Sequence, residues 1–234
     1  MKKILLLSSA LLLCFLVSAQ NEKDYGTIVN FNLTNFKNNA LKAISNQGLV
    51  SELSVDFPLY NGLIAPFVFN ETLISTEKIN GIQTFDAVSK DGKTKMKLTI
   101  TPSGMNGIMH TPEGYFYIEP ADIKNNQYRI YQSSEVKNSS ITCGQEGASA
   151  IINTDKNKRM LSVVPFPVGT QLRTYKLAIA ATGEMTALYG SQDLALAQIV
   201  SIANANNLIY ELETSIKFEL VTQTLNKSII FTNA

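Results

Sequence analysis

The fold of this 234-residue chain is constrained most by a series of short, strand-like segments between residues 49 and 131. Residues 49–57 alternate apolar and polar side chains, and the Asn61-Gly62 pair that follows is typical of a tight turn, so together with the apolar run 63–69 they predict a hairpin. Further strands are expected at residues 82–88, 95–101, 104–110, 115–118 and 127–131. Short strands separated by turn signals predict a β-sandwich or a curled antiparallel sheet.

Two segments have helical periodicity instead. Residues 31–45 predict a short amphipathic helix with Thr34 as its N-cap. Its apolar side chains are Phe36, Ala40, Leu41 and Ile44. Residues 191–210 predict a longer helix, with Ser191 as its N-cap and Asp193 in its first turn. The apolar stripe expected on this second helix consists of Leu194, Ala197, Ile199, Ile202, Ala205 and Ile209.

The last part of the chain has the character of an α/β unit. Residues 174–181 are apolar enough on both faces to predict a central strand, which residues 182–184 interrupt, and residues 215–221 predict another strand after the long helix. Strand, helix and strand in this order predict a right-handed βαβ crossover. A unit of about 60 residues cannot cover both faces of its own sheet, so we expect it to open a larger domain. The predicted class is α+β, with a β-rich antiparallel domain followed by an incomplete βαβ segment.

The first residues predict export. Lys2 and Lys3 precede an apolar run at residues 4–17, and Ala19 offers a cleavage site, which together are typical of a secretory signal peptide. We therefore expect a signal peptide at 1–19, a β-rich domain at 20–137, a linker at 138–170 and the start of an α/β domain at 171–234. The mature protein is expected to be secreted and to have no membrane segment.

Composition excludes several functions. The net charge of +1 and the pI of about 7.7 argue against a nucleic-acid partner, because nucleic-acid-binding domains usually carry a basic face. The single histidine, His110, cannot supply a metal site that needs several histidines, and it is assigned no function. Five aromatic residues predict either packing on a sheet face or a platform for carbohydrate or peptide. They are Tyr115, Phe116, Tyr117, Tyr128 and Tyr131.

The cysteine count leaves one thiol in the mature chain. Cys14 is removed with the signal peptide, so Cys143 has no intramolecular partner in a protein sent to an oxidising compartment. An odd cysteine of this kind is accidental, buried, paired with another chain, or chemically active, and its surroundings in the sequence leave these readings open.

Several blocks resemble bacterial secreted reprolysin-like zinc metallopeptidases of the metzincin clan. The start of the family's catalytic domain is similar to residues 172–184, 206–211, 215–221 and 230–233, in the same order. The family's propeptide is similar to residues 57–62, 97–110 and 117–120. The resemblance implies that the chain is the N-terminal part of a precursor, whose propeptide assists folding and keeps the enzyme latent.

The resemblance also implies where zinc belongs. The family binds it with three histidines of a His-Glu-x-x-His-x-x-Gly-x-x-His motif, which this chain lacks. We therefore expect no cofactor and no peptidase activity for this chain alone, and its implied partner is the remainder of the catalytic domain or an intact homologue. Because Gly144 follows Cys143, as in the cysteine switches of related precursors, Cys143 is a candidate latency ligand for zinc. Two alternatives are a non-catalytic secreted β-rich binding module and a free propeptide that inhibits a homologue in trans.

Overall fold

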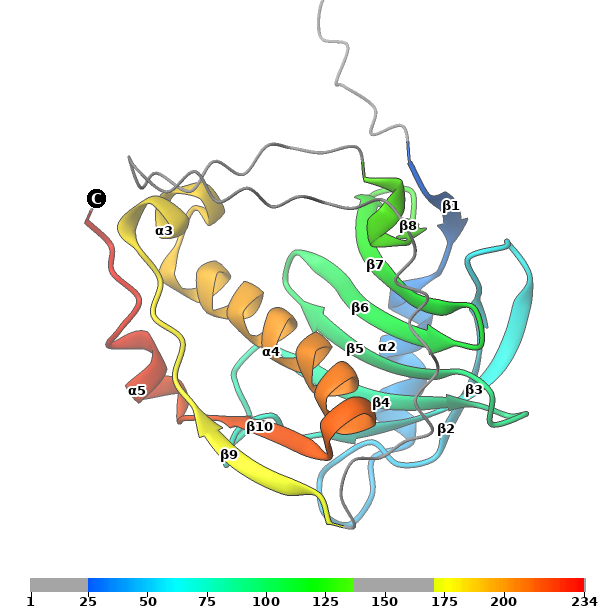
Figure 1. Cartoon of the computed structure of the whole chain (residues 1–234), viewed down its shortest axis with the longest axis horizontal. Coiled ribbons are helices and arrows are strands. Elements are labelled where there is room, and N and C mark those ends of the chain that lie inside the picture. Colours follow the sequence, from blue (N-terminus) through cyan, green and yellow to red (C-terminus); the bar gives the residue numbers. More distant parts are fainter. Residues whose placement is uncertain (1–24, 137–170, 234) are drawn as a thin grey trace, which may run out of the picture.

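A computed structural model describes residues 25–136 and 171–233 and has an α+β fold built around one large antiparallel sheet (Figure 1). The eight strands of this sheet lie in the order β1-β8-β7-β6-β5-β4-β3-β2. Their bounds are β1 Thr27–Asn30, β2 Leu53–Pro58, β3 Ile64–Thr72, β4 Gln83–Ser89, β5 Lys95–Thr101, β6 Gly104–Thr111, β7 Gly114–Asp122 and β8 Gln127–Tyr131. The remaining elements are α2 Leu33–Lys42, the 3-10 turn η2 Ser133–Glu135, β9 Arg173–Leu177, α3 Gly183–Tyr189, α4 Gln192–Thr214, β10 Ile216–Leu220 and α5 Gln223–Lys227.

The antiparallel sheet confirms the expectation of a curled sheet of short strands. From β2 to β8 each strand pairs with the next one along the chain, as hairpin turns dictate. The turn at Asn61-Gly62 joins β2 to β3, and Gly62 there has a φ of 77°, which glycine adopts without steric cost. Strand β1 was not predicted, and it extends the sheet by pairing with β8.

The main core lies on the face of the sheet that carries α2. Phe36 of α2 is buried with its ring centroid 5.1 Å from that of Phe69 and 5.3 Å from that of Phe85. Phe31, which follows β1, lies 4.7 Å from Phe57 of β2 between ring centroids. Because β1 and β2 are the two outer strands, this contact shows that the sheet curls until its ends approach each other over α2.

The start of α2 differs from the prediction. Asn32, not Thr34, is the N-cap, and its side-chain oxygen accepts a hydrogen bond of 2.9 Å from the backbone N–H of Asn35. The helix therefore begins earlier, and its inward face consists of Leu33, Phe36 and Ala40. Leu41 and Ile44 were expected on this face but are exposed.

The βαβ prediction is confirmed in its strand pairing, since β9 and β10 are parallel and α3 and α4 connect them. The prediction of a central strand at 174–181 is wrong for the described residues, because β9 ends at Leu177 and pairs only with β10. Only one face of this segment turns inward, through Leu177, Ile179 and Ala181, while the alternate residues are exposed. The apolar composition therefore came from small alanines that face solvent.

Helix α3 was predicted only as a chain break. Thr182 caps it by accepting a hydrogen bond from the backbone N–H of Met185, and the helix ends at Tyr189 with Gly190 as its C-cap. Helix α4 begins after the predicted cap Ser191, but its buried face is rotated from the expected stripe, and Ile202 is exposed. The rotation arises because α4 packs against the antiparallel sheet on one side and against β10 on another. Among the described residues, no helix is long and apolar enough to cross a lipid bilayer.

Removal of the ring that joins α2 to the sheet should weaken the whole fold. We expect Phe36→Ala to lower the free energy of unfolding by about 3–5 kcal/mol, because it leaves a cavity among three other rings. Leu41→Ala on the same helix should change it by less than about 0.5 kcal/mol, because Leu41 is 68% exposed. Urea denaturation of both variants measures the difference, and equal effects would contradict this account of the core.

Candidate functional site

Those of the singled-out residues that the structure describes do not form one cluster. Cys143, the signal peptide at 1–19 and the linker at 138–170 lie outside the described residues, so the statements made about them stay predictions. His110 lies in β6, and the five aromatic residues lie in β7 and β8. Within residues 25–136 and 171–233, no three histidine, cysteine, aspartate or glutamate side chains are grouped so that they could hold a metal ion.

His110 packs beside its cross-strand neighbour Tyr115, with 4.8 Å between ring centroids. Partial burial lowers the pKa of His110 below its ordinary value, and the positive charge of Lys95 lowers it further, while Glu213 acts in the opposite direction. The His110 ring is therefore half-buried, close to Glu213 at the end of α4.

The aromatic residues are divided between the two faces of the sheet by the alternation along β7 and β8. Phe116 and Tyr128 belong to the core on the α2 face. Tyr117 and Tyr131 are half-buried on the opposite face, with 5.7 Å between their ring centroids, and Tyr25 lies 4.9 Å from Tyr131. Burial raises the pKa of Tyr131, and Glu119 raises it further. A single platform made of all five aromatic residues is therefore ruled out.

The contact between α4 and the antiparallel sheet contains buried polar side chains that bond to one another. Lys97 of β5 is 3% exposed, and its Nζ lies 2.7 Å from Oδ1 of Asp86 and 3.1 Å from Oε2 of Glu211. Asp86 comes from β4 and Glu211 from α4, so the ammonium group joins the sheet to the helix. The other carboxylate oxygen of Glu211 is buried without a hydrogen-bond partner among the described residues. A buried charge of this kind needs its partners, because desolvation is costly.

Two further hydrogen bonds extend this interface along α4. The side-chain amide of Asn204 donates at 3.1 Å to the carbonyl oxygen of Leu98 and at 3.1 Å to the hydroxyl of Thr99. The hydroxyl of Tyr115 donates to Glu213 at 3.0 Å. Burial, together with this carboxylate, raises the pKa of Tyr115. Sequence reasoning missed this interface; the available signals were an asparagine inside an apolar helix and a lysine inside an apolar strand.

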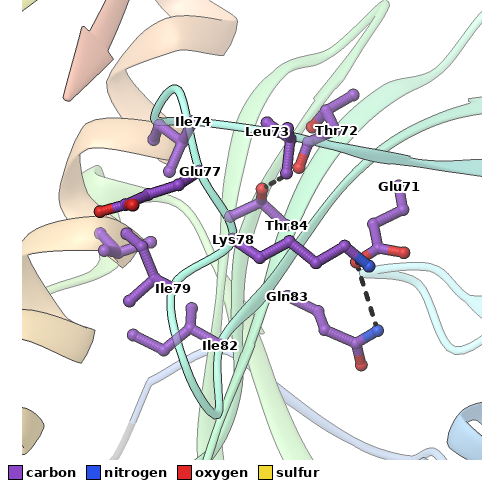
Figure 2. A pocket seen from close by; sticks show the side chains of 11 residues that line it. Glu71, Thr72, Leu73, Ile74, Glu77, Lys78, Ile79, Ile82, Gln83 and Thr84 are labelled. Atoms are coloured by element: carbon purple, nitrogen blue, oxygen red, sulfur yellow. Dashed lines mark hydrogen bonds and ion pairs between the residues drawn. The ribbon is translucent and has the colours of Figure 1, made fainter. Parts of the chain in front are cut away.

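The connection between β3 and β4 contributes a second contact with the βαβ unit. Ile74 and Ile79 share an apolar cluster with α4, and the carbonyl oxygen of Ile74 accepts a hydrogen bond of 2.7 Å from the backbone N–H of Leu220. Figure 2 shows both isoleucines and Glu77 on this connection beside the helix ribbon. Glu77 accepts a hydrogen bond of 3.1 Å from the backbone N–H of Gln223. The connection between β3 and β4 therefore attaches the antiparallel sheet to β10 and α5 as well as to α4.

A small cavity lies beside this connection (Figure 2). Glu71 is buried at its wall, where it accepts a hydrogen bond of 2.9 Å from the backbone N–H of Val50 and lies 3.3 Å from the Nζ of Lys78. The cavity gives the centre of a water molecule about 20 Å³ in which to move. This volume holds about one water molecule and no substrate.

These contacts bind two parts of the chain to each other, and among residues 25–136 and 171–233 they bring together no set of nucleophile, base and oxyanion donor. The candidate functional site is therefore the interface of the sheet with the βαβ unit. Comparison of the whole chain with family models, with curated proteins and with solved structures found no match.

Breaking the buried ion pair tests the interface. We expect Lys97→Met to lower the free energy of unfolding by about 2–3 kcal/mol, less than the roughly 3–5 kcal/mol for a fully buried pair because Asp86 is partly exposed. Lys95→Met, at the exposed first residue of the same strand, is the control. A double-mutant cycle with Glu211→Gln should give a coupling of about 1 kcal/mol or more. Additive effects would contradict a direct interaction.

The pKa of His110 predicts a specific acid sensitivity. Because this pKa is lowered in the folded protein, the unfolded chain binds the proton more tightly, and stability falls as pH drops from about 6.5 towards the lowered pKa. His110→Gln should remove this part of the loss, which is small because the ring is partly open to solvent. Urea unfolding of both proteins at pH 5 and pH 8 compares their acid losses. A larger acid loss in the variant would contradict the sign.

Proposed function

We propose that this chain is the N-terminal part of a secreted zinc metallopeptidase precursor, in which residues 20–137 act as a propeptide and residues 171–234 begin the catalytic domain. The observation that carries the proposal is the interface of Lys97 and Asn204, which holds a parallel βαβ unit on a separate antiparallel sheet. A propeptide that assists folding and maintains latency needs such a contact with the enzyme part of its own chain.

The positions of the resembling blocks support this reading. Residues 172–184 run through β9 to the start of α3, 206–211 lie in the second half of α4, 215–221 contain β10, and 230–233 follow α5. They thus occupy the strands and the crossover helix of one βαβ unit, as the start of an α/β catalytic domain requires. The two strands are parallel, which is the pairing expected when a helix connects them.

The surface of the βαβ unit also supports the proposal. Arg173 donates its backbone N–H to Ser215, and Leu177 accepts from Val221, so the alternate residues Thr174 and Lys176 direct their backbone groups away from β10. Among the described residues this edge of β9 is unpaired, and the neighbouring Tyr175 is 50% exposed. An edge of this kind can accept a further strand of an enzyme domain.

The zinc chemistry of such a precursor would lie elsewhere. When bound, the metal polarises a water molecule for attack on a peptide bond. The described residues do not fit a catalytic zinc site, because they offer one histidine and no grouped ligands. The role of the antiparallel sheet in this proposal is to bind and position α4. Cys143 remains the proposed latency ligand, and the purified 234-residue chain is expected to cleave no peptide.

A proline substitution on the outer edge of β9 tests whether this strand pairs with a further strand in a larger domain. In a precursor extended beyond Ala234, Thr174→Pro should lower the yield of folded enzyme at least about tenfold, because the pairing N–H is lost in what becomes an inner strand. The same change in the 234-residue chain should leave the melting temperature nearly unchanged, and Thr174→Ala is the control in both. Sequencing of the transcript beyond the Ala234 codon supplies the extension, and the absence of a His-Glu-x-x-His sequence there would overturn the proposal.

The latency ligand has its own test in the extended precursor. Cys143→Ser should raise peptidase activity before processing by at least about tenfold, since a hydroxyl is a far poorer zinc ligand than a thiolate. Thr142→Ser, at the neighbouring position, should leave the precursor latent. Peptide hydrolysis measured before and after removal of the propeptide compares the three proteins, and unchanged latency in Cys143→Ser would remove this role.

A further inference from the structure

A groove separates α2 from β2 on the side of the molecule away from α4. Its volume is about 420 Å³, and its walls come from the end of β1, the first turns of α2, β2 and the start of β3. The lining residues that matter below are Asn30, Asn35, Asn39, Ser54, Asp56 and Ile64. None of these residues belongs to the interface with α4, so the groove is a separate feature of the fold.

One wall of the groove is a strand edge that is unpaired among the described residues. Leu59 donates its backbone N–H to Leu63, which fixes the alternation of the β2–β3 ladder. Pro66, opposite Asp56, directs its carbonyl oxygen to Lys90 on the other side. Asp56 and Ser54 therefore direct their N–H and C=O groups away from β3 and towards the groove. β2 is the last strand in the sheet, and no strand in the described part of the chain pairs with this edge.

The opposite wall offers hydrogen-bonding side chains. Asn30, Asn35 and Asn39 are exposed, and within the described residues no side-chain hydrogen bond of theirs occurs. The aromatic rings at the floor, Phe31 and Phe36, are almost completely buried. The groove therefore provides amides and free backbone groups, and it offers no exposed ring on which a sugar or a base could stack.

The charge and shape of the groove further restrict the kind of ligand that it can bind. Asp56 is the one charged residue among those that line it, so a cationic side chain is favoured. Ile64 is 71% exposed at one end, where it can contact one apolar side chain of a ligand. The sheet curls so that Phe31 reaches Phe57, yet β1 and β2 are not paired with each other, so among the described residues the edge of β2 is left open to a further strand.

We propose that this groove binds an extended segment of another polypeptide, which adds to the sheet as a strand along β2 and carries a lysine or arginine that faces Asp56. The backbone of the segment bonds to Ser54 and Asp56, and the asparagine amides of α2 and β1 bond to its polar side chains. This is strand addition, in which main-chain hydrogen bonds give affinity and side-chain contacts give selectivity. The inference does not depend on the peptidase proposal, because it uses no residue of the βαβ unit.

The test begins with a displayed library of random heptapeptides, selected on the immobilised 234-residue chain. We expect the recovered sequences to favour alternating strand-forming residues with one lysine or arginine. The best synthetic peptide should bind with a dissociation constant of about 10–100 μM by fluorescence anisotropy. The same peptide with alternate backbone nitrogens methylated keeps its side chains and should bind at least about tenfold more weakly.

Variants of the protein assign the contact to β2. Ser54→Pro removes an N–H that the β2–β3 ladder does not use, and it should weaken peptide binding at least about tenfold, while Ser54→Ala stays within about twofold. Asp56→Asn should remove the preference for lysine over norleucine in the peptide. Thermal unfolding shows whether each variant is folded, and a misfolded Ser54→Pro leaves the methylated peptide and Asp56→Asn as the deciding measurements.

Three results would overturn the proposal. The first is a library that yields no peptide, and the second is binding that neither methylation nor Asp56→Asn changes. The third is concentration-dependent dimerisation in sedimentation experiments that Ser54→Pro abolishes, because a second copy of the chain would then be the occupant of the groove.

Discussion

The burial of β5 on both of its faces is the constraint on which the rest of the structure depends. Its core-facing residues Met96, Leu98 and Ile100 pack under α2, and its other face carries Lys97 and Thr99, which are equally buried. An ammonium and a hydroxyl can be buried only with partners, and α4 supplies Asn204 for Thr99 and, together with Asp86 of β4, Glu211 for Lys97. The position of the long helix, and with it that of β9 and β10, therefore follows from two polar side chains on one strand.

Local patterns predicted much of the fold because they reflect local physics. Alternation and turn residues such as Asn61-Gly62 determine hairpins between neighbouring strands, so the curled sheet could be anticipated. The predictions failed where long-range packing overrides periodicity. α4 is rotated from its expected stripe because two different surfaces cover it. The segment 174–181 was assigned two apolar faces, although Ala178 and Ala180 are small side chains that face solvent.

The candidate site was less predictable for the same physical reason. Lysine alternating with apolar residues in a strand reads as a solvent-facing side chain, and an asparagine in a helix reads as a weak point of that helix. Their partners lie far along the chain, since Leu98 and Asn204 are 106 positions apart in the sequence. Composition could identify His110 and Cys143 as unusual residues, but it contains no information about which distant side chains meet.

The polar outer face of β5 also matters while the chain is only partly synthesised. The antiparallel sheet is complete by Tyr131, long before α4 is synthesised. During that interval Lys97 and Thr99 are open to water, where a charged and a hydroxyl side chain are well solvated. An apolar surface at the same place would attract other partly folded chains, as exposed hydrophobic faces do. This polar part of the interface is thus compatible with solvent before its partner arrives and with burial afterwards.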